Sequence, residues 1–148
     1  MARLTALTLG ALCASFSAAT QAQDVDQATI LANLGEAYSA ANLENGARVF
    51  RRCQSCHTLT EGGPNMVGPN LFGVLQHAPA SKDYPYSNAL KNADIEWSAE
   101  TMDQWITNPR GFLQGNRMSF AGLRDADQRR DVIAYLAVET YDASAPAQ

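Results

Sequence analysis

The chain is short of the residues that define several common classes of protein. It has three cysteines in 148 residues, and Cys13 lies in a stretch that reads as a removable leader. The remaining pair, Cys53 and Cys56, is too sparse for a disulfide scaffold, which needs many cysteines in a small domain. The length predicts a single domain.

Basic residues are also scarce, because 11 Lys and Arg face 15 Asp and Glu and leave a formal net charge of −4. A nucleic-acid binder carries a basic surface, so this balance argues against nucleic acid as a partner. Internal repeats and alternating strand patterns are absent as well. The sequence therefore predicts an all-α protein with several short helices and long loops.

Residues 1–22 have the pattern of a cleavable signal peptide, with Arg3 before a short apolar stretch and small residues at 20–22. An uncleaved membrane anchor is the alternative, but the stretch is shorter than the ~20 residues of a spanning helix. A lipid anchor on Cys13 would follow a bulky Leu12 where a small residue is expected. The sequence favours export and a periplasmic product.

Four segments are expected: the signal peptide at 1–22, an N-terminal extension at 23–42, a compact domain at 43–140 and a tail at 141–148. The extension carries a weak helical stripe of apolar residues, namely Ile30, Leu31, Leu34 and Tyr38. It is either a short helix packed on the domain or a mobile extension. The first domain helix is expected to start near Leu43 with Asn45 as its N-cap.

Two later helices have clear limits. Ser98 is the expected N-cap of one, which ends at Asn108 because the following Pro109 disfavours helix there. The last helix is expected to start near Asp125 and to end before Thr140. Their predicted buried residues are Met102, Trp105 and Ile106 in the first, and Val132, Tyr135, Leu136 and Val138 in the second.

Cys53-Gln54-Ser55-Cys56-His57 is typical of covalent haem attachment. Its two thiols can add across the two vinyl groups of one haem, and His57 can then ligate the iron. A dithiol redox pair would need a βαβ pattern, and a zinc site would need more ligands than His77 alone can add. Frequent Gly and Pro between residues 57 and 97 indicate long loops, which a buried haem can support by supplying the core.

Three methionines could provide the opposite iron ligand, since a thioether is a soft ligand that raises the haem potential. Met66 lies only nine positions after His57 and would wrap the same side of the ring. Met102 falls on the apolar face of a helix, where methionine ordinarily fills the core. Met118 lies in a loop between two helices, and it is the favoured ligand.

Together with this motif, several further segments resemble class I cytochrome c, in particular its mitochondrial and small purple-bacterial branch. The resemblance covers roughly residues 43–139. The segments that carry it are residues 67–73 (VGPNLFG), 84–89 (YPYSNA), 97, 108–109 (NP), 115–123 (GNRMSFAGL) and 132–136 (VIAYL).

The resemblance implies that fold and one covalently bound haem c. It assigns thioether attachment to Cys53 and Cys56, axial ligation to His57 and Met118, a hydrogen bond from His57 to the Pro69 carbonyl, and propionate binding to Tyr86 and Trp97. It also implies that Gly46 and Phe50 cross the last helix at Val132 and Tyr135, and that Phe120 covers the haem edge.

The chain departs from that family pattern in a few places. Trp105 stands where relatives carry a tyrosine near the methionine sulfur, and Gln114 replaces a customary proline. His77 falls near the position of a propionate-binding arginine. It is either a titrating propionate contact or a surface histidine.

Charge placement suggests how the protein meets its partners. The same resemblance implies that four arginines, Arg52, Arg110, Arg117 and Arg124, surround the exposed haem edge, with the acidic residues elsewhere. Such a front would attract redox proteins with acidic docking surfaces, including membrane complexes met transiently, and those contacts would weaken with salt. The alternative is a set of solvated arginines with no preferred partner.

The predicted function is that of a soluble periplasmic electron carrier, monomeric and without a small-molecule substrate. Two filled axial positions leave no open site on the iron, which argues against an enzyme. Two alternatives remain open: a haem enzyme or gas sensor in which Met118 is displaceable, and a dedicated subunit of a periplasmic dehydrogenase that docks through residues 23–42.

Overall fold

The computed structural model describes residues 25–145, and within them the regular elements are all helical. In chain order they are α1 (Gln27–Asn33), the 3₁₀ helix η1 (Glu36–Tyr38), α2 (Leu43–Phe50), α3 (Asn88–Lys91), α4 (Ala99–Thr107), α5 (Pro109–Phe112) and α6 (Ala126–Glu139). The expected all-α fold is therefore confirmed. Within this part of the chain, no helix has the length and apolar character needed to cross a membrane.

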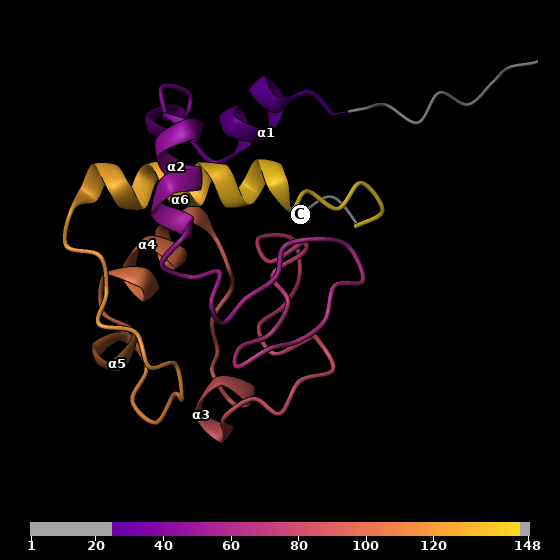
Figure 1. The fold of residues 1–148 in the computed structure, drawn as a ribbon, viewed down its shortest axis with the longest axis vertical. Helices are drawn as coiled ribbons and strands as arrows, with labels where there is room; N and C mark the ends of the chain where they lie inside the picture. Colours follow the sequence, from indigo (N-terminus) through magenta and orange to yellow (C-terminus); the bar gives the residue numbers. More distant parts are fainter. Residues whose placement is uncertain (1–24, 146–148) are drawn as a thin grey trace, which may run out of the picture.

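Helices α2 and α6 cross at close range and form the centre of the helical half (Figure 1). A methyl group at Gly46 would lie 2.2 Å from the backbone oxygen of Asp131 and 2.6 Å from Cβ of Tyr135. Phe50, one turn further on, packs against Tyr135 with ring centroids 5.9 Å apart. Only glycine permits this approach of the two backbones, as the resemblance implied.

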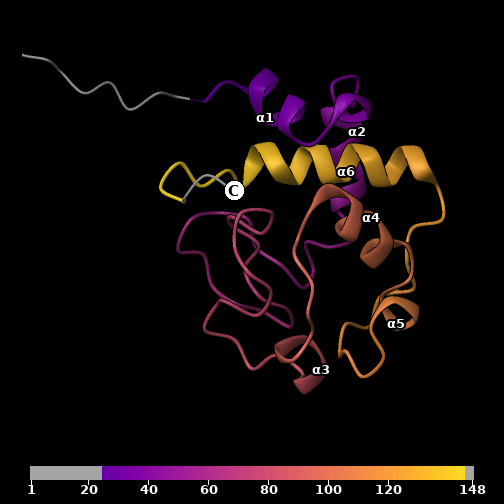
Figure 2. The same ribbon diagram turned by 180° about the vertical axis from the view of Figure 1, so that it is seen from behind.

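Helix α4 lies against the other side of α6, as the reverse view shows (Figure 2). The three helices and the segment before α6 share a core of nine buried residues: Val49, Phe50, Met102, Trp105, Ile106, Leu123, Val132, Ile133 and Leu136. This core confirms the predicted inward face of α4. On α6, Val132 and Leu136 are buried, while Tyr135 and Val138 are half-buried.

Capping residues explain where most of these helices begin. Ser98 forms a capping box with Thr101, and Asp125 accepts a hydrogen bond from the Gln128 N–H, so both predicted starts are confirmed. The predicted N-cap of α2 is wrong: Asn42, rather than Asn45, caps this helix by accepting from the Asn45 N–H at 2.9 Å. Asn45 instead turns its amide toward a carboxylate of α6.

That carboxylate belongs to Asp131, which is only 2 % exposed. It accepts hydrogen bonds from the Asn42 N–H at 3.1 Å and from Asn45 Nδ2 at 2.7 Å, and it pairs with Arg130 at 2.8 Å. These hydrogen bonds hold the pKa of Asp131 below its usual value although burial alone would raise it. Asp131 thus ties the start of α2 to α6.

Residues 25–42 include a short helix that packs on α6 (Figure 1). Ile30 and Leu31 of α1 are buried, and Asp26 caps the helix by accepting from the Thr29 N–H. Of the two interpretations of the extension, the structure has the packed helix. The predicted signal peptide at 1–22 lies outside the described residues.

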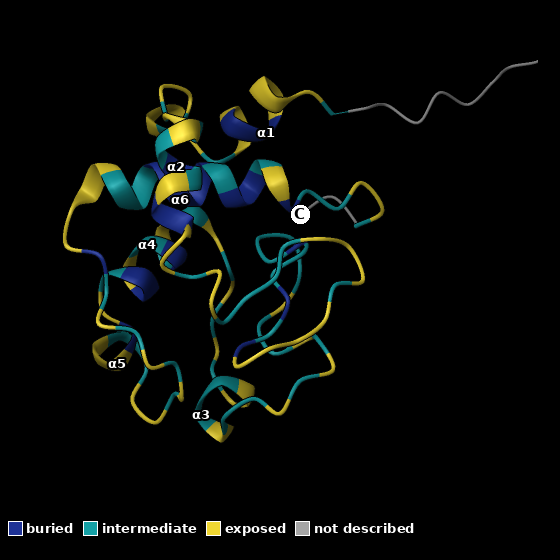
Figure 3. Cartoon of the chain, in the orientation of Figure 1, coloured by how far each residue is buried: buried dark blue, intermediate teal, exposed yellow. Residues whose placement is uncertain are grey.

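From Arg51 to Trp97 the chain consists of turns and loops with one short helix, α3, and this loop half lies below α6 in Figure 1. Few of its residues are buried, in contrast to the helices above it (Figure 3). Gly68, Asn70 and Gly73 are the buried positions. The expectation of long loops between residues 57 and 97 is confirmed, apart from α3.

Candidate haem site

A cavity of about 300 Å³ opens between the loop half and the helical half. Its lining includes all seven residues predicted for the site: Cys53, Cys56, His57, Pro69, Tyr86, Trp97 and Met118. They come from five separate stretches of the chain, so the fold has brought them together. A cavity of this size, largely apolar with a few polar groups, is typical of a cofactor site.

Cys53 and Cys56 lie in the turns that follow α2, where the Cys56 N–H bonds the Cys53 carbonyl at 2.9 Å and the His57 N–H bonds it at 3.0 Å. Both thiols are free and half-buried. Burial raises the pKa of the Cys53 thiol to about 11, which is opposite to the lowered value that activates redox dithiols. The arrangement therefore favours the haem interpretation of the motif over the dithiol one.

The ring of His57 is oriented by the backbone around it. Its Nδ1 donates a hydrogen bond to the Pro69 carbonyl at 2.7 Å, and since a carbonyl only accepts, Nε2 keeps its lone pair. Burial lowers the pKa of His57, against the opposing effect of that hydrogen bond, and this favours the neutral ring. A neutral imidazole fixed through its other nitrogen is the form that ligates a metal.

Gly68 lets the backbone pass close to this imidazole. A methyl group at this position would lie 2.4 Å from Cε1 and 2.8 Å from both nitrogens of His57. The Gly68 N–H also bonds the Cys56 carbonyl at 2.9 Å. The loop after the cysteine motif therefore packs closely against the ring of His57 and fixes its position at the cavity.

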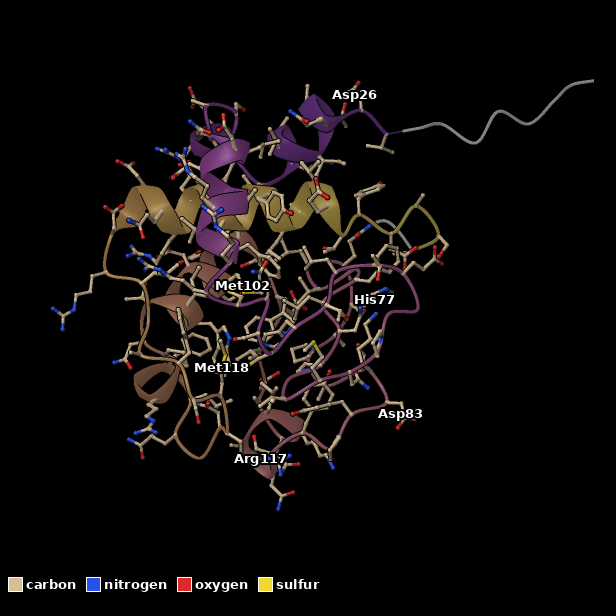
Figure 4. The ribbon with its side chains drawn as sticks, in the orientation of Figure 1. Asp26, His77, Asp83, Met102, Arg117 and Met118 are labelled. Atoms are coloured by element: carbon tan, nitrogen blue, oxygen red, sulfur yellow. The ribbon has the colours of Figure 1, made fainter. Side chains whose placement is uncertain are left out.

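The structure separates the three candidate methionines. Met66 is 47 % exposed and does not line the cavity, whereas Met102 and Met118 both do. Met102 is buried in the core on α4, and Met118 lies on the loop after α5 (Figure 4). A turn holds that loop, because Asn116 accepts from the Met118 N–H at 2.9 Å and donates to the Pro109 and Leu113 carbonyls.

Aromatic side chains form one wall of the cavity. Trp97 and Trp105 meet edge to face at 5.6 Å, and Trp105 meets Phe112 at 6.0 Å. Burial raises the pKa of Tyr86, partly opposed by a backbone hydrogen bond from Lys82, so its hydroxyl stays protonated and can donate. Sequence reasoning expected Tyr86 and Trp97 here, but it missed the contact of Phe112 with Trp105.

His77 lines the cavity, but its ring is already engaged. Nε2 lies 2.9 Å from Oδ2 of Asp142, and the ring stacks over Gly73, whose positive φ of 68° suits glycine. Ser144 and His77 together lower the pKa of Asp142 to about 2. The structure thus gives His77 a partner in the C-terminal tail, which neither alternative reading of this histidine included.

The donor set fits a covalently held haem. Two thiols can bind the vinyl groups, and an imidazole with a thioether is a known axial pair for haem iron. Zinc is not supported, because residues 25–145 contain no group of three His, Cys, Asp or Glu placed to hold a metal. The fold and this site define the class: a small all-α protein that binds one haem through a Cys-x-x-Cys-His motif.

Comparisons with known proteins identify the family. A sequence model of the cytochrome c family matches residues 43–138, and the chain belongs to this family. A cytochrome c homolog of Bradyrhizobium diazoefficiens is 42 % identical over 98 residues, which are 65 % of this chain and 53 % of that protein. Cytochrome c of Theileria annulata is 44 % identical over 92 residues, covering 62 % of this chain and 80 % of the relative.

The fold has a solved counterpart. Cytochrome cH from Methylobacterium extorquens superposes with a TM-score of 0.63 at 31 % identity, covering 66 % of this chain and 99 % of that one. The class I cytochrome c fold and one c-type haem attached through Cys53 and Cys56 follow from these matches. The matched region spans about half of the Bradyrhizobium relative. Electron carrying is the function that the family supports.

Proposed function

We propose that this chain is a periplasmic one-electron carrier that moves electrons from membrane complexes or dehydrogenases to an oxidase or reaction centre. The observation that carries the proposal is the convergence of His57 and Met118 on one cavity beside the two cysteines. The haem supplies an iron that cycles between ferric and ferrous states. The protein would hold the haem through Cys53 and Cys56, shield it from water and supply His57 and Met118 as iron ligands.

Each predicted site residue has a part in that arrangement. His57 and Met118 would ligate the haem iron, and Pro69 holds the imidazole of His57 through its 2.7 Å hydrogen bond. Tyr86 and Trp97 donate hydrogen bonds to a propionate. With both of these ligands supplied by the chain, the iron would have no position open to a substrate, which supports a carrier over an enzyme.

The face around the cavity suits transient protein partners. Val67, which is 77 % exposed, lines the cavity together with Arg52 and Arg117, and Met66 is exposed beside it. An apolar centre with a charged rim is typical of protein interfaces. The cations favour redox proteins with acidic docking surfaces, so the rate of electron transfer with isolated membranes should fall as salt rises. A rate independent of salt would contradict acidic docking.

The decisive test of the proposed function is axial ligation. The Met118→Ala variant should lose the sulfur-to-iron charge-transfer band of the ferric protein, and its reduced form should bind carbon monoxide. Met102→Leu is the matched control, since Met102 lines the same cavity and should leave the band intact. Rapid carbon monoxide binding by the unmodified protein at neutral pH would favour a haem enzyme or sensor instead.

The dehydrogenase-subunit alternative assigns docking to residues 23–42. Ile30 and Leu31, the buried apolar residues of α1, already pack inside this chain, which leaves polar and small residues on its outer face. This packing favours a structural role for the segment. Substitution of the exposed Gln27 and Asn33 by Arg should leave turnover with a periplasmic dehydrogenase unchanged, and lost complex formation would support the alternative.

Localisation has its own test. N-terminal sequencing of the protein purified from the periplasmic fraction should start near residue 23. A product that begins at Met1 and stays with the membrane would contradict export with cleavage.

A further inference from the structure

The charged groups around the haem cavity are of one sign. Its lining includes Arg52, Lys82 and Arg117, together with His77, and it includes no Asp or Glu. Haem carries two propionate carboxylates, and a carboxylate that leaves water needs hydrogen bonds and a cation. The surplus of cations is therefore the complement that such a cofactor requires.

Two of the three permanent cations are poorly placed to serve a buried carboxylate. Arg52 and Arg117 line the cavity, but both are exposed to solvent. His77, the residue expected near a propionate, is held by Asp142 at 2.9 Å.

Lys82 is the cation that remains, and it is half-buried. No carboxylate within residues 25–145 forms an ion pair with it, and its Nζ lies 5.8 Å from the centre of the Phe72 ring. The neighbouring Asp83 is exposed and lies at the outer edge of the loop (Figure 4). A partly desolvated ammonium without an anionic partner is unusual, and an anion in the cavity would relieve it.

The backbone places Lys82 beside the predicted propionate donors. Its carbonyl accepts from the Tyr84 N–H at 2.9 Å, and the Tyr84 carbonyl in turn accepts from the Tyr86 N–H at 2.8 Å. The Tyr84 and Tyr86 rings are 5.0 Å apart, and the Tyr84 hydroxyl bonds the Val67 carbonyl. Lys82 and Tyr86 therefore belong to one hydrogen-bonded turn, and both residues line the cavity.

We propose that Lys82 pairs with a haem propionate at the Tyr86 corner of the cavity. This assignment rests on the proposed function, because it uses the propionate role of Tyr86. The ammonium neutralises the carboxylate, while Tyr86 and Trp97 donate neutral hydrogen bonds. Lys82 thereby makes the propionate contact that sequence reasoning had considered for His77.

The chain offers a matched test, since Lys82 and Lys91 are its only lysines. Lys91 is exposed on α3 and does not line the cavity. Lys82→Met and Lys82→Gln holoproteins should shift the propionate bending mode in the resonance Raman spectrum. They should also lower the midpoint potential, because a lost cation favours ferric iron. Lys82→Arg should retain both values, and Lys91→Met, with the same loss of charge, should change neither.

If Lys82→Met and Lys82→Gln match Lys91→Met in both measurements, Lys82 does not contact a propionate and the inference is overturned. The sulfur-to-iron band is recorded on the same samples. Its presence in all variants keeps the proposed function intact whatever the bending mode does, and its absence from the unmodified protein contradicts the proposed function itself.

Discussion

The helical half and the loop half of this protein are stabilised in different ways. Helices α2, α4 and α6 bury apolar side chains against one another and have a core of their own. The loop half from 51 to 97 buries little, and its order comes from hydrogen bonds such as His57 to Pro69 and Asn70 to Thr58. The two halves meet at the cavity, so the loop half depends on whatever fills it.

The largest expected effect comes from keeping the cavity empty. Without haem, water fills a cavity of about 300 Å³ whose largely apolar lining the ring would otherwise cover, and a small domain has only about 5–15 kcal/mol of stability to lose. The Cys53→Ala/Cys56→Ala chain without haem should therefore lack cooperative unfolding in circular dichroism. A cooperative transition like that of the holoprotein would contradict the dependence on the cofactor.

Next comes the crossing of α2 and α6 in the helical half. Gly46→Ala in the holoprotein should lower the free energy of unfolding by about 3 kcal/mol, because its methyl group meets the Asp131 backbone oxygen at 2.2 Å. Guanidinium denaturation measures this loss. Arg48→Ala, at an exposed site of the same helix, should cost less than about 0.5 kcal/mol. Equal losses in the two variants would show that the crossing is not tight.

The buried carboxylate of Asp131 makes part of the stability of the helical half depend on pH. Asp131→Ala should cost about 2 kcal/mol, since it leaves the Asn42 N–H and the Asn45 amide without their partner. The pKa of Asp131 is lower in the folded protein, so its contribution is present above the unfolded value of 3.8 and is lost as pH falls below it. The free energy of unfolding of Asp131→Ala should therefore vary less with pH than that of the unmodified protein between pH 5 and pH 3, the interval around 3.8. An unchanged pH profile would contradict the role of Asp131.

The smallest effect is expected at the link between the loop half and the tail. His77→Ala removes the contact to Asp142 and should lower the free energy of unfolding less than any of the changes above, because the pair is partly exposed. The pKa of Asp142 should rise from about 2 toward 3.8, so stability would be lost at a higher pH on acidification. The haem spectrum and potential should not change, and a shifted potential would support the propionate reading of His77.

Sequence reasoning was most successful where a signal is local. The capping box at Ser98 and the proline at 109 define the ends of α4 within a few residues. The Cys-x-x-Cys-His motif by itself indicates covalent haem attachment. Asn108 before Pro109 was read as a helix end, although the same pair also caps α5 and starts it. Both functions are local, and the second was missed because α5 has only four residues.

The errors concern residues whose role depends on distant partners. Asn45 looks like an N-cap until Asp131, 86 positions away, takes its amide. His77 could not be assigned because Asp142 lies 65 positions further along the chain. Lys82 carries no motif at all, and only the fold places it on the cavity beside Tyr86. Such pairings arise from tertiary structure, which single-sequence patterns do not report.

The most direct test of a covalently bound haem is the intact mass of the purified holoprotein, measured after denaturation in acid. We expect the mass of the processed chain plus one haem, and loss of that added mass in the Cys53→Ala/Cys56→Ala chain. A mass equal to that of the chain alone, with the pigment released into the solvent, would contradict it.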